Sequence, residues 1–462
     1  MTGRCARSHG SRGRIKNRLA WLLRQRVSHQ STPSGHRRGG HDWISSRLPR
    51  APSRSSSGGK LHKSGPGKKR LSHFTWLATM LLLGACAPDL ALPASTMAST
   101  TPGSTSPPGS AGIPAPFPTE AFAGIRQAAL PDALATELDA ALIDTAGAAG
   151  MTATLMTPEG SWSGATGTAD GVRAVSPADQ MAIGSITKSL VAAQVMQLVD
   201  AGELRLDEPA AGLLPPSLDF DTNGSTIGHL LGMRSGIPDY VDALWASLST
   251  DKLRSWTANE VLALVGPHRT PVGEEHRYSS SDYVLLGLIL EQVRGRPLAE
   301  VLRDGVLSGD DYQRLIYQPA EPPTEPMALP SGAPADTFEE GGGYLPSLAA
   351  TTAAGPAGGM ASDSATLARW WSQLCGGLIV SDSSLNEMTN FDDGDGYGLG
   401  LFDQSEIHGT PAIGNGGIQV GFTAYAACLL EPGSVVVVLS NGTSHDATIK
   451  VADALLVAAG SP

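Results

Sequence analysis

Short apolar runs separated by turn residues occur near both ends of the region that follows residue 121. Residues 151–156 and 162–167 flank a turn that contains Pro and Gly, and so do residues 422–430 and 434–439. Apolar runs of this kind around a Pro- and Gly-containing turn are typical of β-hairpins. We therefore predict one hairpin near each end of this region.

Apolar residues elsewhere recur at the three- and four-residue spacing of amphipathic helices. The ranges with this pattern are 130–142, 187–201, 258–265, 281–294, 365–374 and 443–459. Strands at both ends with helices between them predict an α/β (α+β) fold. We expect an antiparallel sheet built from both chain ends and flanked by helices, with a mostly helical subdomain inserted between the two halves of the sheet.

Charge is distributed unevenly along the chain. Of the 33 Lys and Arg residues, 18 lie in residues 1–70, which contain one of the 44 Asp and Glu residues. That segment therefore carries a net charge of +17, and the remainder carries −28. A body this acidic argues against nucleic acid as a partner, because phosphate binding requires clustered Lys and Arg on a folded surface.

The N-terminal residues resemble a tail followed by an export signal. Residues 1–67 lack apolar periodicity, so we interpret them as a disordered basic tail or as an untranslated extension, with Leu61 as an alternative start. Residues 68–86 resemble a lipoprotein signal peptide, with a cationic start, the apolar run 74–85 and the sequence Leu-Gly-Ala-Cys ending at Cys86. An ordinary secretory signal is the alternative.

The segment after this signal has the composition of a linker. Residues 87–120 are dominated by Pro, Ser, Thr and Ala, which is typical of an extended, solvated tether. A folded domain follows over residues 121–462. Together these segments predict an exported protein that is anchored to the cell membrane by a lipid on Cys86, with its domain outside the cytoplasm. We expect this protein to be a monomer.

The four cysteines do not form a metal-binding framework. The sequence contains no CxxC pair and no HExxH motif, and both are common arrangements of zinc ligands. We therefore expect no metal and no organic cofactor. Cys375 and Cys428 could form a disulfide in an oxidising compartment, and a buried free pair is the alternative.

The strongest local motif is Ser185-Ile-Thr-Lys188 at the start of a helical pattern. In a helix that starts near Ser185, a separation of three residues puts Ser185 and Lys188 on one face, one turn apart. Serine is a weak nucleophile that needs a neighbouring base, and a partly desolvated lysine can serve as one. Residues 71–462 contain only two other lysines. A capping serine beside a solvated lysine is the alternative interpretation.

The same motif belongs to a series of blocks that resemble the serine β-lactamase and penicillin-binding protein superfamily. Residues 181–188 resemble its nucleophile block, 229–238 its HLLTHTSGLP block, 278–287 its YSNTNYxLLG block, and 414–422 its GHGGxxxGF block. The similarity is to the branch of class C β-lactamases, D-alanyl-D-alanine carboxypeptidases and esterases. It covers nearly all of residues 121–462 and implies a β-lactamase/DD-peptidase-like fold, which agrees with the predicted arrangement of strands and helices.

The resemblance implies a role for each matching residue. Ser185 is then the acylated nucleophile, Lys188 takes up or steers its proton, and Tyr278 is the general acid and base that serves the leaving group. The backbone N–H groups of Ser185 and Ile418, beside Gly417, form the oxyanion hole. The implied function is that of an exported serine hydrolase acting on a peptidoglycan peptide, a β-lactam or an ester.

Two positions depart from the family's pattern. The GHGGxxxGF block carries Asn415 where the family has Lys or His, so no charge is available there for a substrate carboxylate. The YSNTNYxLLG block, residues 278–287, has Ser280 where the family has a longer Asn. The first departure favours a small-molecule or peptide substrate without a carboxylate next to the scissile bond. The alternative function is a catalytically impaired penicillin-binding or sensor domain that binds cell-wall peptide.

Overall fold

The computed structural model describes residues 112–461, except 246, 247, 249, 319, 333–336, 392 and 393. The predicted basic tail, the predicted signal peptide with Cys86, and the predicted linker up to residue 111 lie outside the described residues. Within the described part of the chain, no helix is both long and apolar enough to cross a membrane.

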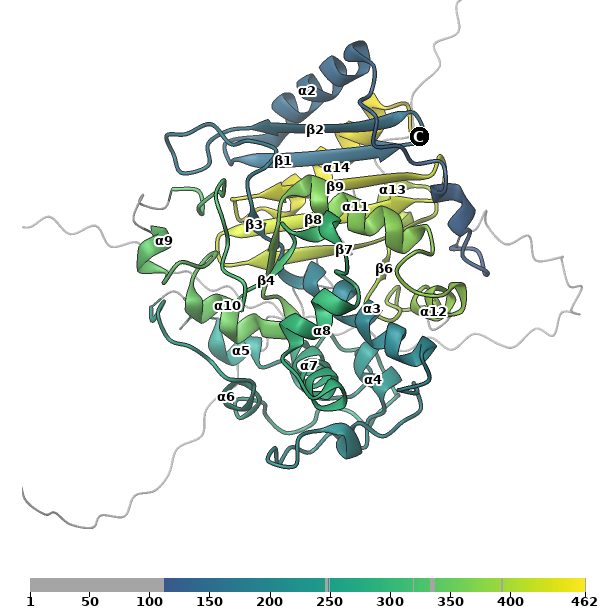
Figure 1. Cartoon of the computed structure of the whole chain (residues 1–462), viewed down its shortest axis with the longest axis vertical. Coiled ribbons are helices and arrows are strands. Elements are labelled where there is room, and N and C mark those ends of the chain that lie inside the picture. Colours follow the sequence, from purple (N-terminus) through teal and green to yellow (C-terminus); the bar gives the residue numbers. More distant parts are fainter. Residues whose placement is uncertain are drawn as a thin grey trace, which may run out of the picture. The chain divides into compact units, whose positions relative to one another are not determined.

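A six-stranded antiparallel sheet with the strand order β2-β1-β9-β8-β7-β6 runs through the described region (Figure 1). The strands are β1 (Met151–Thr157), β2 (Gly160–Thr166), β6 (Phe402–Asp403), β7 (Ala412–Gln419), β8 (Phe422–Leu429) and β9 (Ser434–Ser440). β1 pairs with β9 in the register Met151↔Ser440, so the N-terminal hairpin joins the C-terminal hairpin inside the sheet. This confirms both predicted hairpins and the sheet built from the two chain ends.

Helices cover both faces of this sheet (Figure 1). α2 (Asp132–Ala146) and α14 (His445–Ala458) pack on one face, where Val436 of β9 lies in their apolar cluster. α11 (Ser364–Cys375) packs on the other face, where Val437 is buried. Neighbouring residues of a strand point to opposite faces, and both faces are covered here. The unbroken run of valines in β9 is therefore the sequence of a strand buried on both sides.

The chain between β2 and β6 forms the mostly helical part that the sequence predicts. Its helices are α3 (Thr187–Asp200), α4 (Ile227–Leu231), α5 (Val241–Leu244), α6 (Ala258–Leu262), α7 (Ser280–Arg294), α8 (Leu298–Asp304), α9 (Thr337–Glu340), α10 (Leu348–Ala354), α11 and α12 (Asp382–Met388). A small sheet of order β3-β5-β4 consists of β3 (Met181–Ala182), β4 (Ile316–Tyr317) and β5 (Met360–Ser362). Between β6 and β7 lies the short helix α13 (Ser405–His408), and single 3-10 turns occupy η1 (Thr119–Phe122), η2 (Gly184–Ile186), η3 (Ala210–Leu213), η4 (Asp310–Tyr312) and η5 (Gly355–Ala357).

Three helices differ clearly in extent from their predictions. The helix predicted over residues 130–142 runs from Asp132 to Ala146. The helix predicted over residues 258–265 ends at Leu262, because the N–H groups of Leu264 and Val265 bond to carbonyls three residues back and tighten the last turn. The helix expected to start near Ser185 starts at Thr187. Ser185 lies instead in η2, where Gly184 has a φ of +51° and Ile186 N–H bonds to the carbonyl three residues before it.

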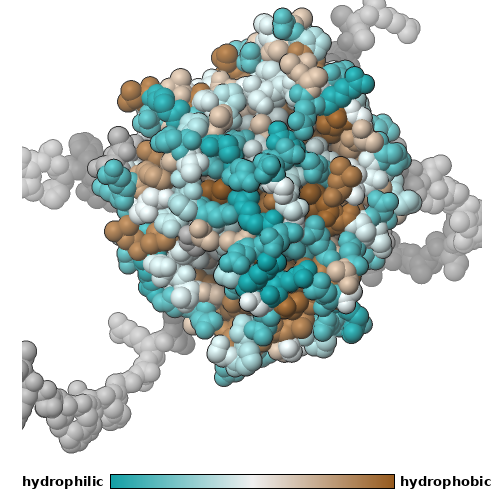
Figure 2. Space-filling model, viewed as in Figure 1, coloured by the Kyte–Doolittle hydropathy of each residue, from teal (hydrophilic) through white to brown (hydrophobic). Residues whose placement is uncertain are grey.

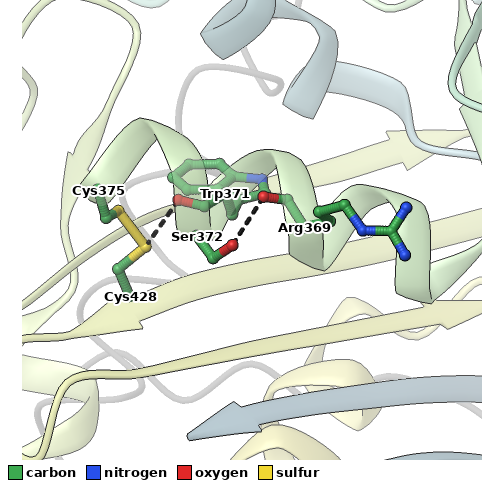
Figure 3. Close-up of a disulfide and its surroundings, with 5 residues drawn as sticks. All are labelled: Arg369, Trp371, Ser372, Cys375 and Cys428. Atoms are coloured by element: carbon green, nitrogen blue, oxygen red, sulfur yellow. Dashed lines mark hydrogen bonds between the residues drawn. A yellow bond between two sulfur atoms is a disulfide. The ribbon is translucent and has the colours of Figure 1, made fainter. Parts of the chain in front are cut away.

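A disulfide joins Cys375 at the end of α11 to Cys428 in β8 (Figure 3). Both cysteines are fully buried, and the bond ties the helix to the sheet that it covers. Of the two alternatives that the sequence leaves open, the structure therefore contains the disulfide. The cross-link spans 53 residues, and a loop of that length restricts the unfolded chain enough to stabilise the fold by about 4 kcal/mol.

The surface seen in Figure 2 is mainly polar, with apolar residues in separate patches. Isolated exposed apolar side chains are normal on a soluble surface, whereas those that border a cavity point to a binding site. Trp245 is 44% exposed and Ile418 is 47% exposed. Both residues line the cavity at the candidate active site.

Candidate active site

Ser185 and Lys188 meet where η2 runs into α3. Ser185 lies in the 3-10 turn and Lys188 in the first turn of the helix. Lys188 Nζ donates hydrogen bonds to Ser185 Oγ at 3.1 Å and to the carbonyl of Ala357 at 2.6 Å. The lysine is only 1% exposed, so protein acceptors take the place of water around its amine. The predicted proximity of the serine and the lysine is present although the helix begins two residues later than expected.

Tyr278 approaches the same serine from the segment before α7. Its hydroxyl donates a hydrogen bond to Ser185 Oγ at 2.7 Å. Lys188 Nζ lies 4.9 Å from the centre of the Tyr278 ring, so the amine also faces the ring. Two donors therefore converge on one hydroxyl oxygen. This arrangement stabilises the negative charge that develops on Oγ when the serine loses its proton.

Strand β7 presents an open edge to Ser185. The carbonyl of Ala412 accepts the N–H of Gln404 on the β6 side, at 2.7 Å. Backbone groups alternate along a strand, so the N–H of Ile418 points to that same side. β6 pairs with β7 only as far as Gly414, and beyond it η2 packs against β7. The N–H of Ile418 therefore faces η2, which carries Ser185, and together with the N–H of Ser185 it is the candidate pair of donors for an oxyanion.

Gly417 permits the close approach of β7 to η2. A Cβ atom at this position would lie 1.9 Å from the carbonyl oxygen of Ile183 and 3.3 Å from the backbone nitrogen of Ser185. Any side chain here would push the strand away from the nucleophile. Only a residue without Cβ fits between the two backbones at this position, so Gly417 sets how closely β7 approaches the turn that carries Ser185.

Asn415 and Ser280, the two positions that depart from the family's pattern, lie in different surroundings. Asn415 is buried, and its Nδ2 donates to Ser189 Oγ at 2.9 Å and to the carbonyl of Gly400 at 3.2 Å. It is not among the residues that line the cavity, whereas Ser280, the first residue of α7, is. The structure therefore places Asn415 behind the site and Ser280 in it.

The cavity at Ser185 has a volume of about 1150 Å³ and is lined by both polar and apolar residues. Ser185, Lys188, Tyr278, Ser280 and Ile418 all border it. Its apolar lining residues include Ile237, Leu244, Trp245, Leu248, Ala350, Ala353, Ala354 and Ala357. A cavity of this size with a few polar groups is typical of a site for a small molecule or a peptide end.

Asp239 is a cavity residue that the sequence analysis missed. Its Oδ1 accepts the N–H of Val241 at 3.0 Å. Burial raises the pKa of the Asp239 carboxyl, while the backbone N–H groups of Val241 and Ser280 and the charge of Lys188 act to lower that pKa. The sequence feature that could have identified Asp239 is its position directly after the 229–238 block. The block alone does not indicate that this side chain faces the cavity.

The arrangement supplies the parts that acyl transfer requires. It contains a nucleophile, two groups that can handle its proton, backbone donors for an oxyanion, and a cavity for the acyl group. Among the residues that the structure describes, no three His, Cys, Asp or Glu side chains lie close enough together to hold a metal ion.

Known proteins share both the sequence pattern and the fold. The Beta-lactamase family model matches residues 132–459. Penicillin-binding protein 4 of Amycolatopsis lactamdurans is 28% identical over 281 residues, which are 56% of this chain and 71% of that protein. The D-amino acid amidase from Ochrobactrum anthropi SV3, complexed with L-phenylalanine, has a TM-score of 0.61 at 23% identity, covering 71% of this chain and 99% of its own. The D-stereospecific amidohydrolase from Streptomyces sp. has a TM-score of 0.56 at 25% identity, covering 70% and 98%. The chain belongs to the Beta-lactamase family.

Proposed function

We propose that this protein is a serine hydrolase that transfers an acyl group through Ser185, from a peptidoglycan peptide, a β-lactam, an ester or a related amide. The observation that carries the proposal is the convergence of Tyr278 Oη and Lys188 Nζ on Ser185 Oγ, at 2.7 and 3.1 Å. Family membership supports the same chemistry, as do the amidase and penicillin-binding names of similar proteins.

In the proposed reaction one member of the Lys188–Tyr278 pair is in its basic form, and it takes the hydroxyl proton of Ser185 as Oγ attacks the substrate carbonyl carbon. The N–H groups of Ser185 and Ile418 hold the negative charge that forms on the carbonyl oxygen. Tyr278 then gives the proton to the leaving nitrogen or oxygen as its bond to the carbonyl carbon breaks. Water attacks the acyl-enzyme along the same route, releases the acid and restores Ser185.

Covalent labelling tests the proposed nucleophile directly. We expect one adduct in the intact mass of residues 112–462 after treatment with a fluorophosphonate, and no adduct for Ser185→Ala. The exposed Ser308 offers a matched control, because Ser308→Ala should react like the parent protein. Labelling by a fluorescent penicillin as well would favour the peptidoglycan and β-lactam substrates. No adduct with either reagent would favour the impaired binding domain.

We also propose that the protein is exported and held at the cell membrane by a lipid on Cys86. The Cys375–Cys428 disulfide supports this location, because disulfides persist in oxidising compartments outside the cytoplasm. The full-length chain, expressed in a bacterium fed a palmitate analogue, should incorporate the label. Cys86→Ser should lose the label and leave the membrane fraction, while Cys5→Ser should behave like the parent chain. Full labelling of Cys86→Ser would contradict the proposal.

A further inference from the structure

His445 lines the cavity beside strand β7 and belongs to none of the sequence blocks that define the site. It is the first residue of α14, and Gly416 and Ile418 of β7 line the same cavity. A Cβ atom on Gly416 would lie 2.7 Å from Cε1 of the His445 ring and closer still to Nε2. The imidazole therefore takes up the space into which a side chain at position 416 would project, two positions before Ile418.

The ring of His445 is held in this place from several sides. It bonds to the backbone carbonyl of Ala424 in β8, and the Tyr425 ring meets it edge-on with 6.2 Å between the ring centres. The Tyr425 hydroxyl in turn shares a hydrogen bond of 2.8 Å with His408 Nε2. His445 as a whole is only 9% exposed. A side chain with these contacts forms a fixed wall of the cavity.

This wall carries no positive charge near neutral pH. Burial lowers the pKa of His445 to about 4, although the nearby Asp446 carboxylate and the bond to Ala424 act to raise that pKa. The imidazole is therefore neutral under ordinary conditions. Asn415, which precedes Gly416 in β7, supplies no cation either, because its amide bonds to Ser189 behind the site.

The cations that line the cavity belong to other elements. Lys188 in α3 is bonded to the nucleophile. Arg269 and Arg277 line the cavity from the exposed segment before α7, where Arg277 pairs with Glu275 at 2.7 Å. A carboxylate bound next to Gly416 would therefore lose water without gaining a cation from β7 or from the first turn of α14. Such a transfer is unfavourable.

We propose that His445 is a specificity-determining residue that selects substrates whose group next to Gly416 is uncharged. This inference rests on the proposed acyl transfer through Ser185. An amide or ester group loses little when it leaves water beside a neutral imidazole, whereas a carboxylate loses its hydration and finds no opposite charge there. The selection then depends on the side chain at position 445, and a cation placed at that position should reverse it.

Two matched pairs of esters separate the charge of a substrate from its shape. 3-Acetoxybenzoate and 3-acetoxybenzamide differ in the charge of the leaving group and share the acyl group. Monophenyl terephthalate and phenyl 4-carbamoylbenzoate differ in the charge of the acyl group and share the leaving group. One pair places its variable group next to Gly416. In that pair the parent protein should hydrolyse the amide-bearing ester with a kcat/KM that is higher by about 10-fold or more.

The variant His445→Lys tests the selection by reversing the charge of the wall. It should raise kcat/KM for the carboxylate member of that pair by about 10- to 100-fold, and change the amide member by less than about 3-fold. The other pair should keep its ratio. His445→Arg repeats the test with a second cation, and His445→Gln, which stays neutral, should keep the parent's preference. The control is Ser308→Lys, which gains the same charge at an exposed position outside the cavity lining and should leave both ratios unchanged.

Unchanged ratios for both pairs in the two cationic variants would overturn the inference, and so would a parent protein with no preference in either pair. A loss of about 100-fold or more on every substrate in His445→Gln would assign the residue to proton handling and would overturn it as well. Labelling of Ser185 by a fluorophosphonate at the parental rate identifies the variants that are folded and keep their nucleophile.

Binding keeps this test separate from that of the proposed function. If Ser185 is not labelled in the parent protein, the proposed acyl transfer fails. Calorimetric titration with 3-hydroxybenzoate against 3-hydroxybenzamide, and with terephthalate against 4-carbamoylbenzoate, would then still decide whether position 445 selects by charge. In one of these pairs the parent protein should bind the amide more tightly, and His445→Lys should bind the carboxylate more tightly.

Discussion

Replacing Lys188 by methionine is expected to lower kcat/KM by about 10³-fold or more, the upper range for loss of a group that handles protons. Methionine has a similar length but cannot donate to Ser185 Oγ or to the carbonyl of Ala357, which the lysine amine contacts at 3.1 and 2.6 Å. Both acceptors are neutral, so the change leaves no unpaired charge in the interior. We therefore expect the free energy of unfolding to be unchanged or increased, because a buried ammonium is costly to desolvate.

Activity and stability must be measured on the same variants for this result to be informative. The control is Lys252→Met, since Lys252 is partly exposed at the surface and pairs there with Glu340. It should retain the kcat/KM of the parent protein with an ester substrate and unfold at a similar urea concentration. A Lys188→Met protein that keeps more than about a tenth of the activity would contradict the proton-handling role. Loss of activity together with loss of the folded state would point to a structural role.

The parts of the fold that the sequence predicts depend on local patterns. The valines of β9 and the turn before them indicate a buried strand of a hairpin whatever the rest of the chain does. The proximity of Ser185 and Lys188 likewise depends only on residues that are close together in the sequence. It survives the change from helix to 3-10 turn at Ser185, because a separation of three residues keeps two side chains on one face in both kinds of turn.

The contacts that the sequence does not predict depend on tertiary packing. Tyr278 lies 93 residues from Ser185, so only the family resemblance brings the two together. For Asn415 the motif gives the position but not the direction of its side chain, which reaches Ser189 of α3 at the back of the site. Asp239 faces the cavity because the loop before it is bonded to α7. Cysteine spacing likewise cannot decide whether Cys375 and Cys428 are joined, since their separation is set by how α11 lies on the sheet.

The variant Tyr278→Phe should distinguish the role of the tyrosine from that of Lys188, because its loss of kcat/KM should depend on the leaving group of the substrate. If Tyr278 gives a proton to the leaving group, an amide, whose amine leaves poorly without that proton, should lose about 10³-fold in kcat/KM. A 4-nitrophenyl ester leaves readily as an anion and should lose only about 10-fold. Lys188→Met acts on the nucleophile and should reduce both substrates alike.

The amide and the ester used in this comparison must therefore carry the same acyl group. The control variant is Tyr312→Phe, which also loses a tyrosine hydroxyl. Tyr312 is buried in η4 and is not among the residues that line the cavity, so its substitution should leave the ratio of the two rates unchanged. Equal losses on amide and ester in Tyr278→Phe would contradict leaving-group protonation by this residue. Equal losses would mean that Tyr278 acts only on Ser185, where the 2.7 Å hydrogen bond from its hydroxyl stabilises the attacking oxygen.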